Sequence, residues 1–388
     1  MLKIMKKINL WRMWVVVLLG GLATGCRGDL PLLQEDTEGL APGNPQTSVK
    51  GFFLLNEGNM GSNKASLDFY NAETGHYLRN IYPSRNPGVV KELGDVGNDL
   101  AVYGRKLYAV INCSHYVEVM DARTARHVGS IDLLNCRYLA FHGDKAYISS
   151  YAGPVQINPD ARPGKVVEVD TARLQITREV VVGYQPEEMV VSRGKLYVAN
   201  SGGYRFPNYD RTVSVIDLET FQVVKTIEVA INLHRMEVDR FGRIYVSSRG
   251  DYSQTQPDVY VIDSGTDQVT GRLGVPASEL CLSGDSLYLT SVAWSNETHR
   301  NEVSYAVYDV VREQVVSRNF IADGTDREIQ IPYGLAVNPD TKEIYVTDAK
   351  DYVTPGTLYC FSPQGYLQWK VSTGDIPAHF AFTRQPFQ

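Results

Sequence analysis

The residues of this sequence best suited to binding a ligand are aromatic side chains that alternate with amides and charged groups. The rings stand in its long polar segments, at Tyr151, Tyr204, Phe206, Tyr209, Tyr252, Trp294 and Tyr352. Their polar neighbours include Asn56, Glu57, Asn63, Asn200, Arg205, Asp210, Arg249, Asn296 and Asp348. Rings can hold an apolar plate while amides and guanidinium groups bind its polar edge. The pattern predicts non-covalent binding of a large ligand, although the same tyrosines could simply pack on one another.

Catalytic chemistry has no comparable signature in this chain. The sequence contains no G-x-S-x-G elbow, no H-E-x-x-H, no Walker loop and no C-x-x-C pair. Its 7 histidines are scattered, so a metal site would need ligands from distant segments. We therefore predict that the protein is not an enzyme and uses no catalytic cofactor.

The charge balance argues against a nucleic-acid partner. The 388 residues include 38 Lys and Arg against 44 Asp and Glu, a formal net charge of −6, and the basic residues are not clustered in the body of the chain. A protein that binds a duplex needs a positive surface that displaces counterions from phosphates. We expect no nucleic acid to bind.

An internal repeat indicates which elements must position these residues. An apolar residue followed by Tyr recurs at Leu107-Tyr108, Ala146-Tyr147, Leu196-Tyr197, Ile244-Tyr245, Leu287-Tyr288 and Ile344-Tyr345. Each pair follows an apolar strand and a Gly or Asp turn, and it precedes an alternating strand and then a fourth strand. Four short strands that recur at roughly 40 to 50 residues are typical of β-propeller blades.

The ends of the repeat indicate how the ring closes. A first unit at 51–58, 65–71 and 76–82 lacks its innermost strand, and the segment PAHFAF at 377–382 can supply it. Pairing of strands from the two ends of the chain in one sheet would close the ring of blades. We predict an all-β protein with one seven-bladed propeller of four-stranded blades over 49–388, closed by pairing of the C-terminal strand with the first blade.

The long connections of these blades are expected on one face. The connections between second and third strands are long, whereas the opposite turns, such as GRK and GDK, are tight. Polar residues at strand ends would line the mouth of the central channel, where they could bind ligand or only hydrate the channel. Arg137 and Arg235 are the best placed to contact a phosphate or amide. The predicted ligand-binding residues are Asn56, Asn112, Arg137, Tyr151, Glu187, Asn200, Tyr204, Phe206, Arg235, Arg249, Tyr252, Trp294, Tyr333 and Asp348.

The first residues predict export and a lipid anchor. Basic residues from Lys3 to Arg12 precede the apolar run WVVVLLGGLA at 14–23, which is too short for a permanent membrane span, so 1–25 are predicted to be a signal peptide. The sequence Ala-Thr-Gly-Cys26 resembles the lipobox of bacterial lipoproteins, which implies acylation of Cys26. The polar, acidic segment 26–48 is predicted to be a lipidated flexible tether, and it resembles the surface-export signal of Bacteroidota lipoproteins.

The four cysteines beyond Cys26 divide into two pairs. Cys281 and Cys360 lie in apolar strands and are expected to pack in the core. Cys113 and Cys136 fall near connections on the elaborated face, so in an exported protein they could form a disulfide.

Longer stretches resemble a known family. The strands IYVSSRG, KLYVANSGG and EIYVTDAKD resemble the YVTN-repeat, YncE-like propellers. The opening LLNEGNMGSNKASLDFYNAETG and LGDVGNDLAVYGRKLYAVI resemble the propeller lipoproteins of Bacteroidota, above all the BtuG-type cobalamin-binding surface lipoproteins. The resemblance implies capture of cobalamin or a related corrinoid, delivery to a TonB-dependent outer-membrane transporter, and a lipid-anchored place on the outer membrane facing the exterior.

Two alternatives remain open. A divalent-metal-dependent, lactonase-like hydrolase would hold its cation at the channel mouth, with Glu57, Asn200 and Asp348 as candidate ligands. A protein- or glycan-docking platform that serves another transporter would use the same aromatic residues.

Overall fold

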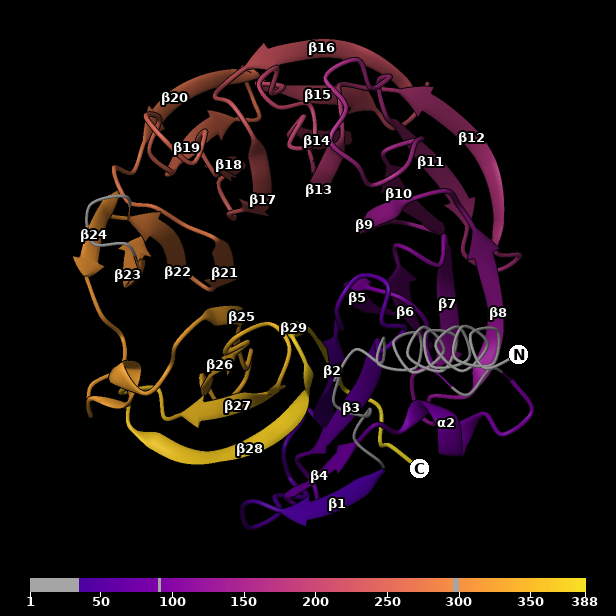
Figure 1. Cartoon of the computed structure of the whole chain (residues 1–388), viewed down its shortest axis with the longest axis vertical. Helices are drawn as coiled ribbons and strands as arrows, with labels where there is room; N and C mark the ends of the chain where they lie inside the picture. Colours follow the sequence, from indigo (N-terminus) through magenta and orange to yellow (C-terminus); the bar gives the residue numbers. More distant parts are fainter. Residues whose placement is uncertain (1–34, 90–91, 296–299) are drawn as a thin grey trace, which may run out of the picture. The chain divides into compact units, whose positions relative to one another are not determined.

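The computed structural model describes residues 35–89, 92–295 and 300–388, which fold as seven antiparallel sheets arranged in a ring (Figure 1). The predicted all-β, seven-bladed propeller is thereby confirmed. Only two short helical segments interrupt the strands of the described residues, namely α2 (Tyr82–Arg85) and a 3-10 turn (Thr325–Arg327). No helix among these residues is long and apolar enough to cross a membrane.

Six of the seven sheets use four strands that follow one another in the chain, and the sheet of the first blade adds the C-terminal strand to four consecutive ones. The first blade contains β1 (Asp36–Gly39), β2 (Gly51–Asn56), β3 (Ser66–Asn71), β4 (His76–Arg79) and β29 (Pro377–Thr383). The second contains β5 (Gly97–Tyr103), β6 (Lys106–Ile111), β7 (Tyr116–Asp121) and β8 (His127–Asp132). The third contains β9 (Cys136–His142), β10 (Lys145–Ser150), β11 (Lys165–Asp170) and β12 (Gln175–Val181).

The remaining four blades repeat this order around the ring. The fourth contains β13 (Pro186–Ser192), β14 (Lys195–Asn200), β15 (Thr212–Asp217) and β16 (Gln222–Glu228). The fifth contains β17 (Leu233–Val238), β18 (Arg243–Ser248), β19 (Asp258–Asp263) and β20 (Gln268–Arg272). The sixth contains β21 (Glu279–Ser283), β22 (Ser286–Ser295), β23 (Arg300–Asp309) and β24 (Gln314–Ser317). The seventh contains β25 (Pro332–Val337), β26 (Ile344–Asp348), β27 (Pro355–Phe361) and β28 (Leu367–Asp375).

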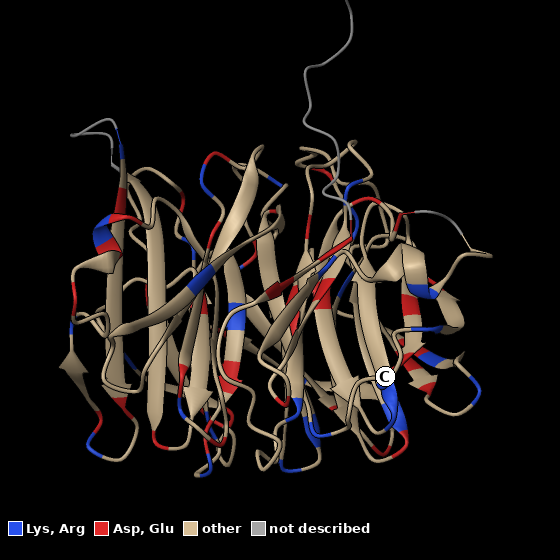
Figure 2. Cartoon of the chain, turned by 90° about the horizontal axis from the view of Figure 1, so that it is seen from below, with Lys and Arg blue, Asp and Glu red and all other residues tan. Residues whose placement is uncertain are grey.

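The apolar-Tyr pairs hold neighbouring blades together. Successive side chains of a strand point to opposite faces of its sheet, so the two members of each pair face different neighbours. Tyr197 of the fourth blade packs with Leu233 and Ile244 of the fifth, whereas Leu196 packs with Tyr147 of the third. The hydrophobic core is therefore divided into clusters between blades. In the side view of Figure 2, the strands run from one face of the ring to the other.

The first blade closes the ring as predicted. Strand β29 pairs with β2 in an antiparallel register that sets Gly51 opposite Thr383 and Phe52 opposite Phe382. The ring of Phe52 also contacts Phe380 at 5.4 Å and Tyr345 of the seventh blade at 4.7 Å between centroids. The two ends of the fold are thus joined by a backbone ladder and by packed rings.

The folded unit begins earlier than the sequence suggested. Strand β1 pairs with β4 at the outer edge of the first blade, with Asp36 opposite Arg79 and Gly39 opposite His76. The predicted flexible tether 26–48 is therefore wrong for its second half. Composition misleads here because β1 is held by backbone pairing and its side chains are all exposed. The signal peptide 1–25 and Cys26 lie outside the described residues.

The innermost strands carry an irregularity that matters for the site. In most blades the register of their pairing with the second strand shifts by one residue, as between Gly97 and Asp99, Pro186 and Met189, and Leu233 and Met236. A bulge lets consecutive residues leave the regular alternation. Residues at the bulged positions that line the central cavity are Asn98, Arg137, Tyr138, Glu187, His234, Arg235 and Tyr333.

Candidate ligand-binding site

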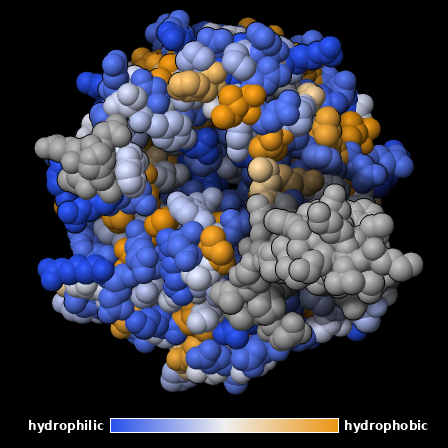
Figure 3. All heavy atoms as spheres, in the orientation of Figure 1, coloured by the Kyte–Doolittle hydropathy of each residue, from blue (hydrophilic) through white to orange (hydrophobic). Residues whose placement is uncertain are grey.

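A cavity of about 1150 Å³ opens at the centre of the ring, on the face that carries the connections between second and third strands. Figure 3 shows this hollow from the open side, with hydrophilic residues in its depth. Ligand pockets commonly measure roughly 300–1,000 Å³, so this cavity has room for a large ligand.

Most of the predicted ligand-binding residues lie together in this cavity. Those that line it are Asn112, Arg137, Tyr151, Glu187, Tyr204, Phe206, Arg235, Arg249, Tyr252, Trp294 and Tyr333. The predicted concentration of long connections on one face therefore agrees with the structure.

Asn56 and Asn200, in contrast, point into their own blades and do not line the cavity, so the prediction was wrong for both. The Nδ2 of Asn56 donates to Ser66 Oγ at 3.1 Å, and that of Asn200 donates to Ser214 Oγ at 3.0 Å. Both amides are fully buried. At the end of the second strand, such a side chain holds the start of the third strand and has no access to a ligand.

Asp348 was also wrongly placed among the ligand-binding residues. Its carboxylate accepts the backbone N–H groups of Ile331 and Lys350, both at 2.9 Å. Glu57 lines the cavity, but Asn200 and Asp348 do not join it there, so the candidate metal ligands are not assembled. Across 35–89, 92–295 and 300–388, no group of three or more His, Cys, Asp or Glu side chains could hold a metal ion.

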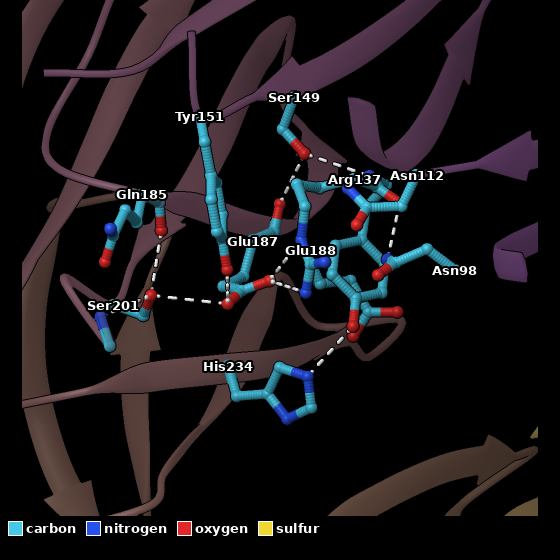
Figure 4. Close-up of polar contacts among 12 residues, drawn as sticks. Asn98, Asn112, Arg137, Ser149, Tyr151, Gln185, Glu187, Glu188, Ser201 and His234 are labelled. Carbon is cyan, nitrogen blue, oxygen red and sulfur yellow. Dashed lines mark hydrogen bonds and ion pairs between the residues drawn. The ribbon is translucent and has the colours of Figure 1, made fainter. Parts of the chain in front are cut away.

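A cluster around Glu187 forms one side of the cavity floor (Figure 4). Oε2 of Glu187 accepts Nε and Nη2 of Arg137 at 3.2 and 3.1 Å. Its Oε1 accepts the hydroxyl of Tyr151 at 2.5 Å and that of Ser201 at 3.3 Å, and Arg249 Nη1 lies 3.6 Å away. Burial alone would raise the pKa of Glu187, but Arg137, Arg249 and the hydrogen bonds outweigh it and lower the pKa. We call these five residues the Glu187 cluster.

A second cluster surrounds Arg235. The guanidinium donates from Nε and Nη2 to Glu279 Oε1 at 2.8 and 2.7 Å, and its Nη1 lies 3.7 Å from Glu188 Oε1. Burial raises the pKa of Glu279 and raises that of Glu188 to about 8. Glu188 is further held by accepting the backbone N–H of Met236 at 2.6 Å. We call Arg235, Glu188 and Glu279 the Arg235 cluster.

Tyr138 and His234 lie between these clusters. The ring of Tyr138 faces the guanidinium groups of Arg137 and Arg235 at 5.8 and 5.1 Å, and its hydroxyl lies 2.9 Å from His234 Nε2. Burial first, and then the neighbouring Arg249, Arg235 and Arg137, lower the pKa of His234 well below its ordinary value. The imidazole is therefore neutral near pH 7, so Tyr138 donates to it.

Apolar side chains form the rim above this polar floor. Phe206, Tyr252 and Trp294 line the cavity with 55%, 64% and 57% of their surface exposed. Tyr151, predicted as one of these rings, instead lies buried on the floor because its hydroxyl is bound to Glu187. An apolar rim over a charged floor can take a ligand with a flat apolar body and a polar end.

A family profile described as a domain of unknown function, DUF5074, matches residues 50–362. The chain belongs to the DUF5074 family. Among curated proteins, none matches the sequence.

Solved structures similar to this DUF5074 chain share its fold at low identity. Hydrazine synthase from Kuenenia stuttgartiensis is 18% identical, with a TM-score of 0.54 over 68% of this chain and 76% of that one. A quinonprotein alcohol dehydrogenase-like protein from Bacteroides thetaiotaomicron is 15% identical, with a TM-score of 0.57 over 86% and 78%. AztD from Citrobacter koseri is 11% identical, with a TM-score of 0.50 over 86% and 98%. At these identities the likeness extends to the fold alone.

The cavity of the DUF5074 chain also contains residues that the sequence analysis missed. They include Asn98, Tyr138, Val155 and Ile157. Tyr138 was missed because strict alternation assigns only one of Arg137 and Tyr138 to the channel, whereas the bulge exposes both to the cavity. The break in alternation at Cys136–Tyr138 is the only sequence signal that could have indicated it.

The four cysteines among the described residues of the DUF5074 chain, Cys113, Cys136, Cys281 and Cys360, are free thiols, so the disulfide considered for Cys113 and Cys136 is not formed. Cys136 is buried, with Sγ 3.4 Å from the carbonyl of Tyr116, and its pKa is raised to about 12, mainly by burial. Cys360 is buried in the core as predicted, and Cys281 is partly buried against a different hydrophobic cluster, between the sixth and seventh blades.

Proposed function

We propose that this DUF5074 protein is a non-enzymatic binding protein that captures cobalamin or a related corrinoid in the central cavity. The observation that supports the proposal most is the pairing of an apolar rim with a charged floor in about 1150 Å³. A corrinoid is a flat macrocycle bordered by amide side chains, with a nucleotide tail. Rings such as Trp294 suit the macrocycle, and the exposed amide of Asn301 suits its border.

We further propose that the protein is anchored to the outer membrane through acylated Cys26, faces the cell exterior and passes the corrinoid to a TonB-dependent transporter. The lipobox-like sequence before Cys26 and the resemblance to BtuG-type lipoproteins support this part. Labelling cells with a radioactive fatty acid tests it: the wild type should take up label, and Cys26→Ala should not. Loss of the protein from the surface of intact cells should accompany that variant.

An absorbance titration of the purified protein with cyanocobalamin tests the capture itself. We expect a one-to-one complex whose affinity falls about tenfold in Trp294→Ala, because a rim ring that packs on the ligand is lost. Tyr366→Ala is the matched control, since Tyr366 is similarly exposed at 56% but does not line the cavity. Absence of any complex would reject the proposal, whereas an equal effect of both variants would reject the placement of the ligand on the rim.

A further inference from the structure

The carboxylate of Glu187 has no hydrogen-bond acceptor site left for Arg249. Four hydrogen bonds reach its two oxygens, two from Arg137 and one each from Tyr151 and Ser201. Arg249 Nη1 approaches Oε1 only to 3.6 Å, which is beyond hydrogen-bonding distance. The competing donors therefore keep Arg249 from forming a bidentate pair with the one carboxylate that it faces.

The guanidinium of Arg249 consequently retains donors that face the cavity. Among the described residues, Glu187 is its one ion-pair partner, and its guanidinium forms no hydrogen bond there. It lines the cavity, with 27% of its side chain exposed. A guanidinium is a fork of five N–H donors that matches the oxygens of a phosphate or carboxylate.

Charge on the floor favours an anion at the same point. The Glu187 cluster holds two guanidinium groups and one carboxylate, so it carries one unbalanced positive charge. Arg235, in contrast, meets both Glu279 and Glu188. Glu57 is likewise engaged, because it accepts Tyr333 at 2.9 Å and contacts His379 at 3.0 Å. A cation held in a partly dehydrated cavity is stabilised by an anionic partner.

We propose that Arg249 binds an oxyanion group of the ligand, such as a phosphodiester, at the Glu187 side of the cavity. This assigns the anionic end of the ligand to Arg249, and it corrects the expectation that Arg235 is one of the two best-placed residues. The identity of the ligand rests on the proposed corrinoid capture, but the preference for an oxyanion rests on the Glu187 cluster alone.

Titrations with cyanocobalamin and with dicyanocobinamide, which lacks the nucleotide and its phosphodiester, test this inference. We expect Arg249→Gln to weaken cobalamin binding about tenfold and to leave cobinamide binding unchanged. Arg249→Lys, which keeps the charge, should recover part of the loss. Arg272→Gln removes an equal charge from an arginine that is 70% exposed on the outer strand β20, and it should change neither affinity.

The outcomes separate this inference from the proposed function. If Arg249→Gln weakens both corrinoids equally, or neither, the oxyanion site is wrong while corrinoid capture stands. If the wild type binds no corrinoid, the capture proposal fails, and inorganic pyrophosphate then tests the site by itself. Pyrophosphate should raise the melting temperature of the wild type and not that of Arg249→Gln, and equal shifts in the two proteins would overturn the inference.

Discussion

The two charged clusters of the cavity floor use similar residues in opposite proportions. In the Arg235 cluster, one guanidinium lies between two carboxylates. In the Glu187 cluster, one carboxylate lies between two guanidinium groups. In the Arg235 cluster the charges of Arg235 and Glu279 balance, because the raised pKa of Glu188 keeps Glu188 largely protonated near neutral pH. The Glu187 cluster, in contrast, has a surplus positive charge that faces the cavity.

This difference separates residues that hold the ring from residues available to a ligand. Arg235 connects carboxylates from the fourth and sixth blades, so removing it takes away a polar contact shared by three neighbouring blades. Arg249 adds little to the ring, because its closest ion pair is 3.6 Å long. Stability should therefore depend on the first arginine, and ligand binding on the second.

The largest effect is expected for Arg235→Met, which keeps the volume of the side chain but leaves Glu279 buried without its cation. Breaking a buried pair in this way typically costs about 3–5 kcal/mol. Urea unfolding at pH 7 measures the loss, with Arg272→Gln as the control for a change in net charge. A loss below about 1 kcal/mol would show that the Arg235 cluster does not hold the blades together.

Glu187→Gln should have the next largest effect, because Arg137 and Arg249 lose their shared anion. We expect a loss of about 2–3 kcal/mol at pH 7. The lowered pKa of Glu187 means that its stabilisation is fully present above the ordinary Glu value and is lost as the pH falls through the folded-state value. Unfolding curves of wild type and variant should therefore converge in acid, and a constant gap down to pH 2 would contradict the assignment.

Glu188→Gln should produce a smaller effect that depends on pH in the opposite direction. The pKa of Glu188 is raised to about 8, so between the ordinary Glu value and pH 8 the folded protein holds a proton that the unfolded chain has released. Wild-type stability should fall as the pH rises through this window, by up to about 1.4 kcal/mol per pH unit, and the variant should lose less. Parallel pH profiles for the two proteins would contradict the expectation.

The smallest effect on stability is expected for Arg249→Gln. Its 3.6 Å ion pair is partly exposed, so the free energy of unfolding without ligand should change by less than about 1 kcal/mol. Thermal unfolding beside Arg235→Met provides a direct comparison. A similar loss in both variants would remove the distinction between the two clusters.

The seven-bladed ring could be predicted from the sequence because the residues that repeat from blade to blade are buried in the core. Each apolar-Tyr pair serves two interfaces, so packing imposes the same pattern in almost every blade. Strand β1 has no such sequence pattern, because its side chains are exposed and it is held by backbone pairing with β4. Backbone pairing at an edge places few demands on side-chain type.

The cavity was predictable to the extent that strand ends and long loops locate it. Trp294 and Tyr252 were found because they stand in long connections on the face of the cavity. Asn56 and Asn200 were assigned to the cavity because they end second strands, but the direction of a side chain at a strand end depends on hydrogen bonds made after folding. Tyr138 was missed for a related reason, since a bulge depends on how two strands meet.

The closure of the first blade by β29 affects how the protein folds during its synthesis. Strand β29 follows every other strand in the sequence, yet its partner β2 is among the first to be synthesised. Until residues 377–383 have emerged, a growing chain carries β2 with one open edge, and such an edge readily pairs with other chains. The final contact also spans the longest sequence separation in the fold, which makes its formation slow. A chain that still lacks residues 377–383 is therefore prone to aggregate through the uncovered edge of β2.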